Sequence, residues 1–250
     1  MKLVKFVHNK EVKFGVVEGN EVILLEENFL NSIKKTSVKL SLSEIELLSP
    51  VFPSKFVCVG LNYRDHANEM KESLPTEPVL FLKPSTAVNH PNYPISYPPQ
   101  TKNLHYEAEL VVVIGKTAKN VKIEDAKGYI LGYTCGNDVT ARDLQKKDVQ
   151  WTRAKSFDSF APIGPWIETE IDPNSLDIKL ILNGEIKQKS NTSNLIFKPD
   201  FLVSFISSVM TLLPGDVLMT GTPSGVGPMK VGDDVSVVIE NIGTLPNRII

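Results

Sequence analysis

The stretch His105-Tyr106-Glu107-Ala108-Glu109-Leu110-Val111-Val112-Val113-Ile114 places two glutamates directly before a run of apolar residues. Such a run, rich in β-branched side chains, predicts a buried β-strand. Because side chains alternate between the two faces of a strand, Glu107 and Glu109 should point the same way. Two carboxylates on one face repel each other unless a cation lies between them, and a hard divalent cation such as Mg²⁺ suits oxygen ligands. The alternative is an exposed strand edge with two solvated acids.

A third carboxylate follows in Gly136-Asn137-Asp138-Val139-Thr140-Ala141-Arg142-Asp143-Leu144-Gln145. Small and polar residues open this segment and helix formers continue it, which predicts a helix start. Asp138, Arg142 and Gln145 are spaced i, i+4 and i+7, so they should share one helical face. An ordinary Asp-Arg pair on a solvated helix would also give this spacing. Carboxylates from one strand and one helix start together predict a metal site with open positions for water or substrate.

The composition is that of an ordinary soluble protein. The 250 residues carry a formal net charge of -2, with 42% hydrophobic and 22% charged residues. This balance predicts no attraction to nucleic acid or to an anionic membrane. The first residues lack the apolar core of a signal peptide, and no apolar run approaches the ~20 residues that span a bilayer. We therefore expect a cytoplasmic protein, in which Cys58 and Cys135 are buried, reduced thiols.

Turn signals divide the chain into two expected parts. Residues 1–50 should form a small β-rich appendage, with short strands on either side of the turn Glu18-Gly19-Asn20. Residues 51–250 should form the main domain, which opens with a strand at 55–59 and a short helix at 64–70. The four prolines within 90–100 predict an extended loop. Strands dominate this domain and helices are few.

Three later segments also have clear patterns. Residues 178–187 predict a hairpin with a primed turn at Asn183-Gly184, residues 201–213 a helix, and residues 234–240 an alternating strand. The glycine-rich loop at 220–227 lacks the Lys-Ser/Thr ending of a phosphate loop. Its backbone N–H groups and the Thr222 hydroxyl are expected instead to face an anionic group of a substrate.

Five motifs stand in the order in which a known family has them. They are Gly60-Leu61-Asn62-Tyr63, Tyr106-Glu107-Ala108-Glu109, Asn137-Asp138-Val139-Thr140-Ala141-Arg142-Asp143, Ala154-Lys155-Ser156-Phe157-Asp158 and Thr220-Gly221-Thr222-Pro223. Over about residues 50–250 the chain resembles the fumarylacetoacetate hydrolase family, with its acylpyruvate hydrolases and its 2-hydroxyhepta-2,4-diene-1,7-dioate isomerases of aromatic compound catabolism. The resemblance implies a mostly β (α+β) fold around a rolled mixed β-sheet, usually in a homodimer. It also implies Mg²⁺ or Mn²⁺ held by Glu107, Glu109 and Asp138.

His66 and Glu69 lie three residues apart on the short helix predicted after Asn62-Tyr63, so they can share one face and a hydrogen bond. A lone surface histidine is commonly inert. In family members with a matching pair, however, the two residues activate water on a lid that orders over bound substrate. The resemblance therefore implies that His66 is a general base whose imidazole is oriented by Glu69.

Charge balance in the expected site calls for basic residues. Carboxylates at Glu107, Glu109 and Asp138 leave a charge near -1 with one divalent ion, and an anionic substrate adds to it. Arg142 and Lys155 match residues that line the family's substrate pocket. The alternative for Lys155 is an exposed lysine on a loop. The remaining matches to that pocket are the neutral hydrogen-bond partners Gln145 and Thr222.

The expected reaction is hydrolytic C–C cleavage of a 2,4-dioxo acid of the acylpyruvate type through a metal-stabilised enolate. His66 with Glu69 would direct water at the C4 carbonyl, and Lys155 would help to neutralise developing charge. The same enolate serves decarboxylation of oxaloacetate and isomerisation of a 2-hydroxymuconate-type diacid, so both stay open. A sugar-acid dehydratase and a catalytically silent metal-binding scaffold also stay open.

Overall fold

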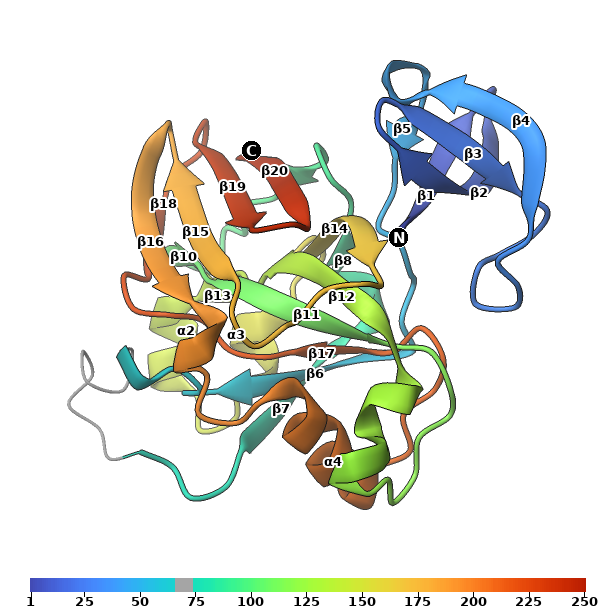
Figure 1. Ribbon diagram of the computed structural model, residues 1–250. Helices are drawn as coiled ribbons and strands as arrows, with labels where there is room; N and C mark the ends of the chain where they lie inside the picture. The colour runs from blue at the N-terminus through green and yellow to red at the C-terminus, as the bar shows by residue number, and fades with distance from the viewer. Residues whose placement is uncertain (66–73) are drawn as a thin grey trace.

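The computed structural model describes residues 1–65 and 74–250. A long mixed sheet runs through the molecule, and all neighbours along it are antiparallel except the parallel pair β17 and β6 (Figure 1). In spatial order its strands are β4 (Lys35–Ser41), β3 (Glu21–Leu25), β2 (Glu11–Glu18), β1 (Lys2–His8), β14 (Ala161–Glu168), β12 (Ile130–Asn137), β11 (Ala108–Ile114), β17 (Val217–Met219), β6 (Lys55–Gly60) and β7 (Val79–Pro84). At its side β5 (Glu46–Leu47) pairs with β1, and β8 (Val88–Asn89) pairs with β14.

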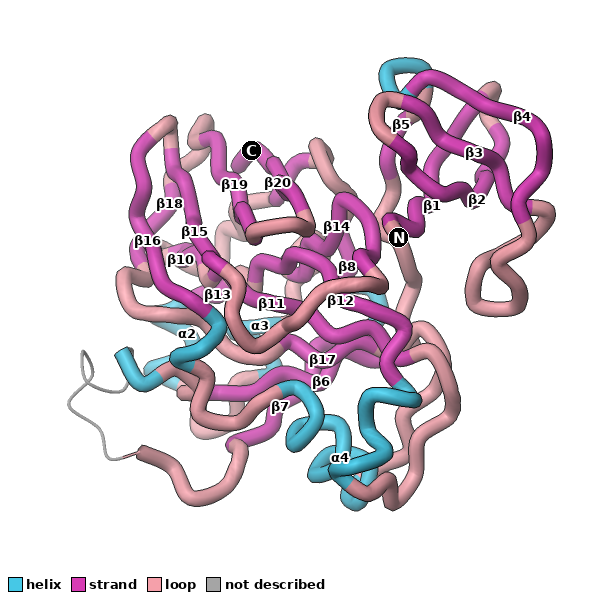
Figure 2. Tube along the Cα trace, in the orientation of Figure 1, coloured by secondary structure: helices cyan, strands magenta, loops and turns pink. Residues whose placement is uncertain are grey.

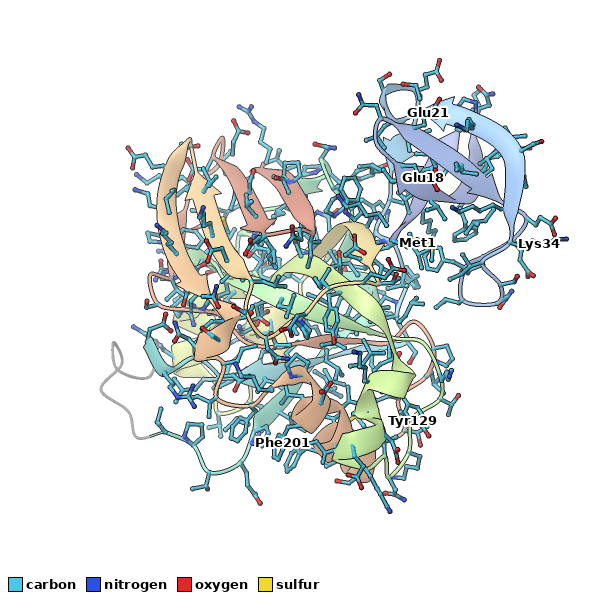
Figure 3. All side chains as sticks on the ribbon, viewed as in Figure 1. Met1, Glu18, Glu21, Lys34, Tyr129 and Phe201 are labelled. Carbon is cyan, nitrogen blue, oxygen red and sulfur yellow. The ribbon has the colours of Figure 1, made fainter. Side chains whose placement is uncertain are left out.

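Residues 1–50 contribute one end of this sheet and stand out as the blue lobe of Figure 1. A turn at Gly19, with φ of +61°, joins β2 to β3 where the sequence predicts it. Pairing of β1 with β14 then continues the main sheet into the lobe. Exposed ion pairs cover its outer surface, where Figure 3 labels Glu18, Glu21 and Lys34. The domain boundary expected at this point stays a prediction.

Two smaller sheets close over the long one (Figure 2). One contains β16 (Glu185–Asn191), β15 (Asp177–Leu182), β19 (Asp234–Ile239), β20 (Gly243–Ile249) and β9 (Pro94–Ile95), and the other contains β13 (Thr140–Ala141), β10 (Leu104–Tyr106) and β18 (Gly227–Met229). Leu110 and Val112 of β11 lie in the apolar core that includes β15 and β19, while Val111 and Val113 lie in a second core on the opposite face. Because both faces of β11 are buried, its sequence is apolar without interruption from Leu110 to Ile114.

Helices are few in the described residues. They are α2 (Arg142–Lys147), α3 (Thr152–Lys155) and α4 (Pro199–Val209), with 3-10 turns η1 (Leu42–Glu44), η2 (Ser85–Ala87), η3 (Ile123–Tyr129) and η4 (Thr192–Asn194). The helix expected at 201–213 is α4, which buries Leu202, Val203 and Ile206 and packs beside η3 at the bottom of Figure 1. None of these helices has the length and apolar character needed to cross a membrane.

The predicted fold class is confirmed, since strands dominate and form rolled mixed sheets. The hairpin at 178–187 is also confirmed, with φ of +51° at Asn183 and +82° at Gly184, as a primed turn requires. The predicted strands at 55–59 and 234–240 correspond to β6 and β19. The helix expected at 64–70 lies, from residue 66 onward, outside the described residues.

Candidate active site

Three buried carboxylates converge where β11 and β12 lie side by side. Glu107 stands between β10 and β11, Glu109 lies within β11, and Asp138 directly follows β12. In the antiparallel register of these strands, Glu109 is opposite Gly136. One carboxylate oxygen from each of the three acids lies within 4.8 Å of the others. The structure therefore brings the three predicted metal ligands together, with exposed fractions of 6%, 2% and 1%.

The prediction that Asp138 begins a helix is wrong. The segment continues β12 up to Asn137, and α2 begins only at Arg142. The Asn137 side-chain oxygen accepts a hydrogen bond from the Glu107 N–H at 2.9 Å, and the Asp138 N–H donates to the Glu107 carbonyl at 2.9 Å. Bonds between the two chain segments thus fix Asp138 at a strand end. Arg142 Nη1 still donates to Gln145 Oε1 at 2.5 Å, so these two residues share a face of α2.

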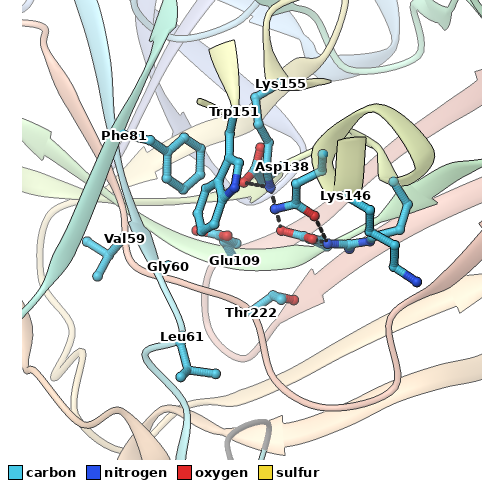
Figure 4. A pocket seen from close by; sticks show the side chains of 13 residues that line it. Val59, Gly60, Leu61, Phe81, Glu109, Asp138, Lys146, Trp151, Lys155 and Thr222 are labelled. Carbon is cyan, nitrogen blue, oxygen red and sulfur yellow. Dashed lines mark hydrogen bonds and ion pairs between the residues drawn. The ribbon is translucent and has the colours of Figure 1, made fainter. Parts of the chain in front are cut away.

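Lys155 lies between two of the acids. Its Nζ donates to Glu107 Oε2 at 2.9 Å and to Asp138 Oδ2 at 2.5 Å. Only 2% of Lys155 is exposed, so the alternative of an exposed loop lysine is wrong. Arg142 forms an ion pair with the other oxygen of Glu107. Both predicted cations therefore contact the acidic cluster directly (Figure 4).

Lys83 is a third cation at the cluster, and the sequence analysis missed it. It is fully buried, pairs with Asp138 Oδ1, and donates to the carbonyl oxygens of Phe160 at 2.6 Å and Val139 at 3.2 Å. A signal existed in the sequence, because Lys83 directly follows the apolar run Val79-Leu80-Phe81-Leu82 within β7. A buried lysine needs partners, and Asp138 supplies the charged one.

The two glutamates differ in their electrostatic surroundings. Burial raises the pKa of Glu107, but the nearby Lys155 and Arg142 cations outweigh it and hold that pKa well below its ordinary value. Burial raises the pKa of Glu109 well above its ordinary value, and the Asp138 and Glu107 carboxylates add to the effect. Among the described residues, Glu109 has no ion-pair partner. A bound cation would remove the unfavourable energy of its charge.

The donor set fits a hard divalent cation. Carboxylate oxygens from Glu107, Glu109 and Asp138 are the ligands that Mg²⁺ and Mn²⁺ prefer. Each oxygen has two lone pairs, so the contacts with Lys83 and Lys155 leave capacity for a metal ion. The three acids are thus the residues that would hold the ion.

A cavity of about 300 Å³ opens beside the acids (Figure 4). Its aromatic wall is formed by Phe81 and Trp151, whose rings meet edge to face with centroids 5.3 Å apart. Lys155 Nζ lies 4.9 Å from the centroid of the Phe81 ring. The polar lining includes the predicted residues Arg142, Gln145 and Thr222. The structure therefore places every predicted site residue that it describes at one cavity.

The loop after β17 connects Glu109 to Thr222. Gly221 donates its backbone N–H to Glu109 Oε2 at 2.7 Å and has φ of +98°. A Cβ at Gly221 would lie 2.8 Å from the Cβ of Asn62, so only glycine fits without a shift. The loop was expected to present an N–H group to a substrate anion, but the Gly221 N–H contacts the Glu109 carboxylate instead. His66 and Glu69 lie outside the described residues, so their roles stay predictions.

Two protein-family models together match almost the whole chain. The family model for the fumarylacetoacetate (FAA) hydrolase C-terminal domain matches residues 55–250. A second model, described as Rv2993c-like, N-terminal, matches residues 1–50. The mitochondrial oxaloacetate tautomerase Fahd2a of Rattus norvegicus is 41% identical over 220 residues, which are 83% of this chain and 70% of that protein.

Solved structures agree over the full length. The 5-carboxymethyl-2-hydroxymuconate delta-isomerase of Mycobacterium smegmatis superposes with a TM-score of 0.95 at 43% identity, covering 100% of this chain and 99% of the other. Maleylpyruvate hydrolase of Sphingobium sp. SYK-6, solved with manganese (II) and pyruvate, superposes with a TM-score of 0.84 at 30% identity and the same coverage. The family model, the full-length similarity and the acidic cluster together show that this chain belongs to the fumarylacetoacetate hydrolase family.

Proposed function

We propose that this protein is a divalent-metal-dependent enzyme that interconverts tautomers or double-bond isomers of a short 2-oxo dicarboxylic acid. The observation that carries the proposal is the pairing of the acidic cluster with buried cations beside one cavity. The similarity to an oxaloacetate tautomerase and to a muconate delta-isomerase supports this reaction class. Both reactions move a proton next to a 2-oxo group and need no attacking water.

The charge of the site favours a dianion as substrate. Lys83, Lys155 and Arg142 contribute +3, and the three carboxylates that they contact or adjoin contribute -3. A divalent ion held by the carboxylates brings the sum within the cluster to about +2, and the exposed Lys146, which also lines the cavity, adds a further positive charge. A dicarboxylate of charge -2 balances the cluster, whereas an acylpyruvate of charge -1 leaves a positive excess. Lys83, absent from the expected site, accounts for this difference.

Side chains around the cavity supply the remaining steps. Arg142 and Gln145, joined by a hydrogen bond of 2.5 Å, and Thr222, which also lines the cavity, offer donors that orient substrate carboxylates. Lys155 lies beside Glu107 and Asp138, where it can stabilise negative charge that develops on the substrate. Phe81 and Trp151 exclude water from one side. A bound Mg²⁺ or Mn²⁺ would supply Lewis-acid stabilisation of charge on the 2-oxo oxygen.

Hydrolytic C–C cleavage of an acylpyruvate-type substrate is the second candidate. The similarity to a maleylpyruvate hydrolase over the full chain favours it. Cleavage needs a base that activates water, and the residues expected in that role, His66 and Glu69, lie outside the described residues. A silent scaffold is disfavoured, because buried Lys83 and Lys155 carry a desolvation cost that an apolar core avoids. We also propose that the protein is a homodimer, which light scattering would test, and that it is cytoplasmic, which cell fractionation would test.

The test uses the purified protein with Mg²⁺ or Mn²⁺, freshly dissolved oxaloacetate enol and acetylpyruvate. Ultraviolet absorbance follows loss of the enol, and proton NMR follows acetate and pyruvate. Metal-dependent acceleration of enol loss, abolished by chelator, supports the tautomerase. Acetate released only with metal supports the hydrolase, and pyruvate from oxaloacetate without acetate supports a decarboxylase. No metal-dependent turnover of these substrates or of an unsaturated 2-hydroxy diacid would overturn the proposal.

A further inference from the structure

Gln188 is a buried polar residue that reaches two parts of the site. It lies in β16 between the exposed Lys187 and Lys189, so the alternation of the strand turns its side chain inward. Its Oε1 accepts a hydrogen bond from the Ala108 N–H at 2.9 Å, and its Nε2 donates to Thr222 Oγ1 at 2.9 Å. Only 1% of Gln188 is exposed. No motif or spacing in the sequence points to this residue.

These contacts join the metal-ligand segment to the substrate-side loop. Ala108 stands between Glu107 and Glu109, and Glu109 accepts from Gly221, the residue before Thr222. Gln188 therefore closes a ring of contacts through strand β11 and the loop. The loop is held at its other end by Asn62, whose Nδ2 donates to the Thr220 carbonyl at 2.7 Å. The position of Thr222 is thus fixed from two sides.

The partners of Gln188 also fix the direction of each hydrogen bond. The Ala108 N–H can only donate and the Pro223 carbonyl, 2.8 Å from Nε2, can only accept, so the amide cannot be flipped. Thr222 Oγ1 must then accept from Gln188. Among the described residues, the Thr222 hydroxyl proton has no acceptor, and Thr222 lines the cavity with Glu109 and Asp138. The proton remains available to a ligand there.

We propose that Gln188 is a positioning residue that makes the Thr222 hydroxyl a hydrogen-bond donor to an anionic ligand in the cavity. The inference rests on the proposed function, since it takes the ligand to be a 2-oxo carboxylate. Without Gln188, the Pro223 carbonyl loses its donor and the Thr222 hydroxyl can turn toward it. The ligand would then lose a hydrogen-bond donor.

Binding of oxalate, a planar mimic of a 2-oxo carboxylate, tests this without turnover. Isothermal titration calorimetry with Mg²⁺ would compare the wild type with Gln188→Met, Thr222→Val and the double variant. We expect each single change to weaken oxalate binding roughly tenfold, as loss of a hydrogen bond to a charged group does. The double variant should match Thr222→Val alone, because Gln188 acts through Thr222. Lys189→Gln, an exposed neighbour on β16, is the control and should bind normally.

Four outcomes overturn the inference. Unchanged oxalate affinity in Gln188→Met overturns the role of Gln188 but not the proposed function. Independent, additive losses of affinity in the double variant do the same. A wild type that binds no oxalate overturns the proposed function as well. Thermal melting checks that each variant folds. If Gln188→Met does not fold, Thr222→Ser keeps the hydroxyl and must bind like the wild type, whereas equal weakening in Thr222→Ser and Thr222→Val overturns the donor role.

Discussion

A buried carboxylate lies beside each end of β17, Asp216 at one end and Glu109 of β11 at the other, and the two have opposite surroundings. Asp216, just before the strand, accepts a hydrogen bond from the Ser54 hydroxyl at 2.6 Å and forms an ion pair with Lys55. It also accepts from three backbone N–H groups, those of Ser54, Lys55 and Leu213, at 3.0, 3.3 and 2.8 Å. Glu109, beside the far end, accepts one hydrogen bond, from Gly221, among the described residues. Both side chains are almost completely buried.

Their pKa values move in opposite directions. Burial raises the pKa of Asp216. Hydrogen bonds from Lys55 and Ser54, together with the charge of Lys55, outweigh that effect, so the pKa lies below its ordinary value. Burial and two neighbouring carboxylates raise the pKa of Glu109 well above its ordinary value. A buried carboxylate with a full set of donors stabilises the fold. One that lacks them destabilises the ligand-free protein and gains its partner only when a cation binds.

The largest expected effect is that of Glu109→Gln on activity. Removing one metal ligand should lower the metal-dependent rate at least about a hundredfold, since Lewis-acid stabilisation contributes several kcal/mol. In chelator, the melting temperature should stay the same or rise, because a buried carboxyl group whose ionisation is unfavourable is gone. Enol kinetics and thermal melting measure the two effects. A strongly destabilised Glu109→Gln protein would break the comparison, because Glu109 would then resemble Asp216.

Asp216→Asn should have the reverse profile. Removing one partner of a buried ion pair typically costs about 3–5 kcal/mol, and a lower loss of about 2 kcal/mol is expected here because Lys55 reaches solvent. The melting temperature should fall by roughly 4–8 °C. Oxalate affinity with Mg²⁺ should not change. Thermal melting and calorimetry check both, with the exposed Asp125→Asn as control; weakened oxalate binding would contradict a purely structural role for Asp216.

Lys83→Met sharpens the comparison, because the Lys83–Asp138 pair resembles Lys55–Asp216 in chemistry but lies in the site. Loss of one unit charge near the ligand should weaken oxalate binding roughly tenfold, or on the order of 1–2 kcal/mol, and affect monoanionic pyruvate less. Mg²⁺ affinity should not fall, because less positive charge faces the ion. The matched Lys55→Met should lower stability without changing oxalate over pyruvate selectivity. If Lys83→Met and Lys55→Met bind oxalate and pyruvate with the same selectivity, the role of Lys83 is structural, like that of Lys55.

The smallest expected effect is a pH dependence of stability. Asp216 has a lowered pKa in the folded state, so its contribution is present above the unfolded pKa of about 3.9 and is lost as the pH falls through the folded value. The difference in unfolding free energy between wild type and Asp216→Asn should be constant from about pH 5 to 7 and shrink below about pH 4. Urea unfolding at several pH values measures it. A difference that grows on acidification would contradict the assignment.

Local patterns predicted much of the fold and part of the site. The run 110–114 identified a buried strand, and Asn183-Gly184 identified a primed hairpin turn, because each pattern acts through nearest neighbours along the chain. The period of a strand also placed Glu107 and Glu109 on one side, although a break between β10 and β11 falls at Glu107. Motif resemblance led to Asp138, Arg142 and Lys155; in the structure Lys155 contacts Asp138, and Arg142 contacts Glu107.

The helix expected at Asp138 shows where local reading fails. Small polar residues before helix formers look like a helix cap, and the i, i+4 spacing to Arg142 fits a helix equally well. In the fold, the Asp138 N–H donates to the Glu107 carbonyl and the Asn137 side-chain oxygen accepts from the Glu107 N–H. These two hydrogen bonds extend the strand pairing instead. Glu107, the partner in these hydrogen bonds, lies 30 residues before Asn137 in the sequence. No propensity computed along one segment contains that contribution.

The sequence by itself determined a mostly β chain, its buried central strand and the kinds of side chain that could bind a cation. Only the tertiary structure decided that Lys83 faces Asp138, that Gln188 reaches Thr222, and which buried carboxylates are fully paired. The physical reason is that charge pairing and desolvation depend on distances between groups far apart in sequence. Periodicity and propensity act over a few neighbouring residues and therefore carry no information about those distances.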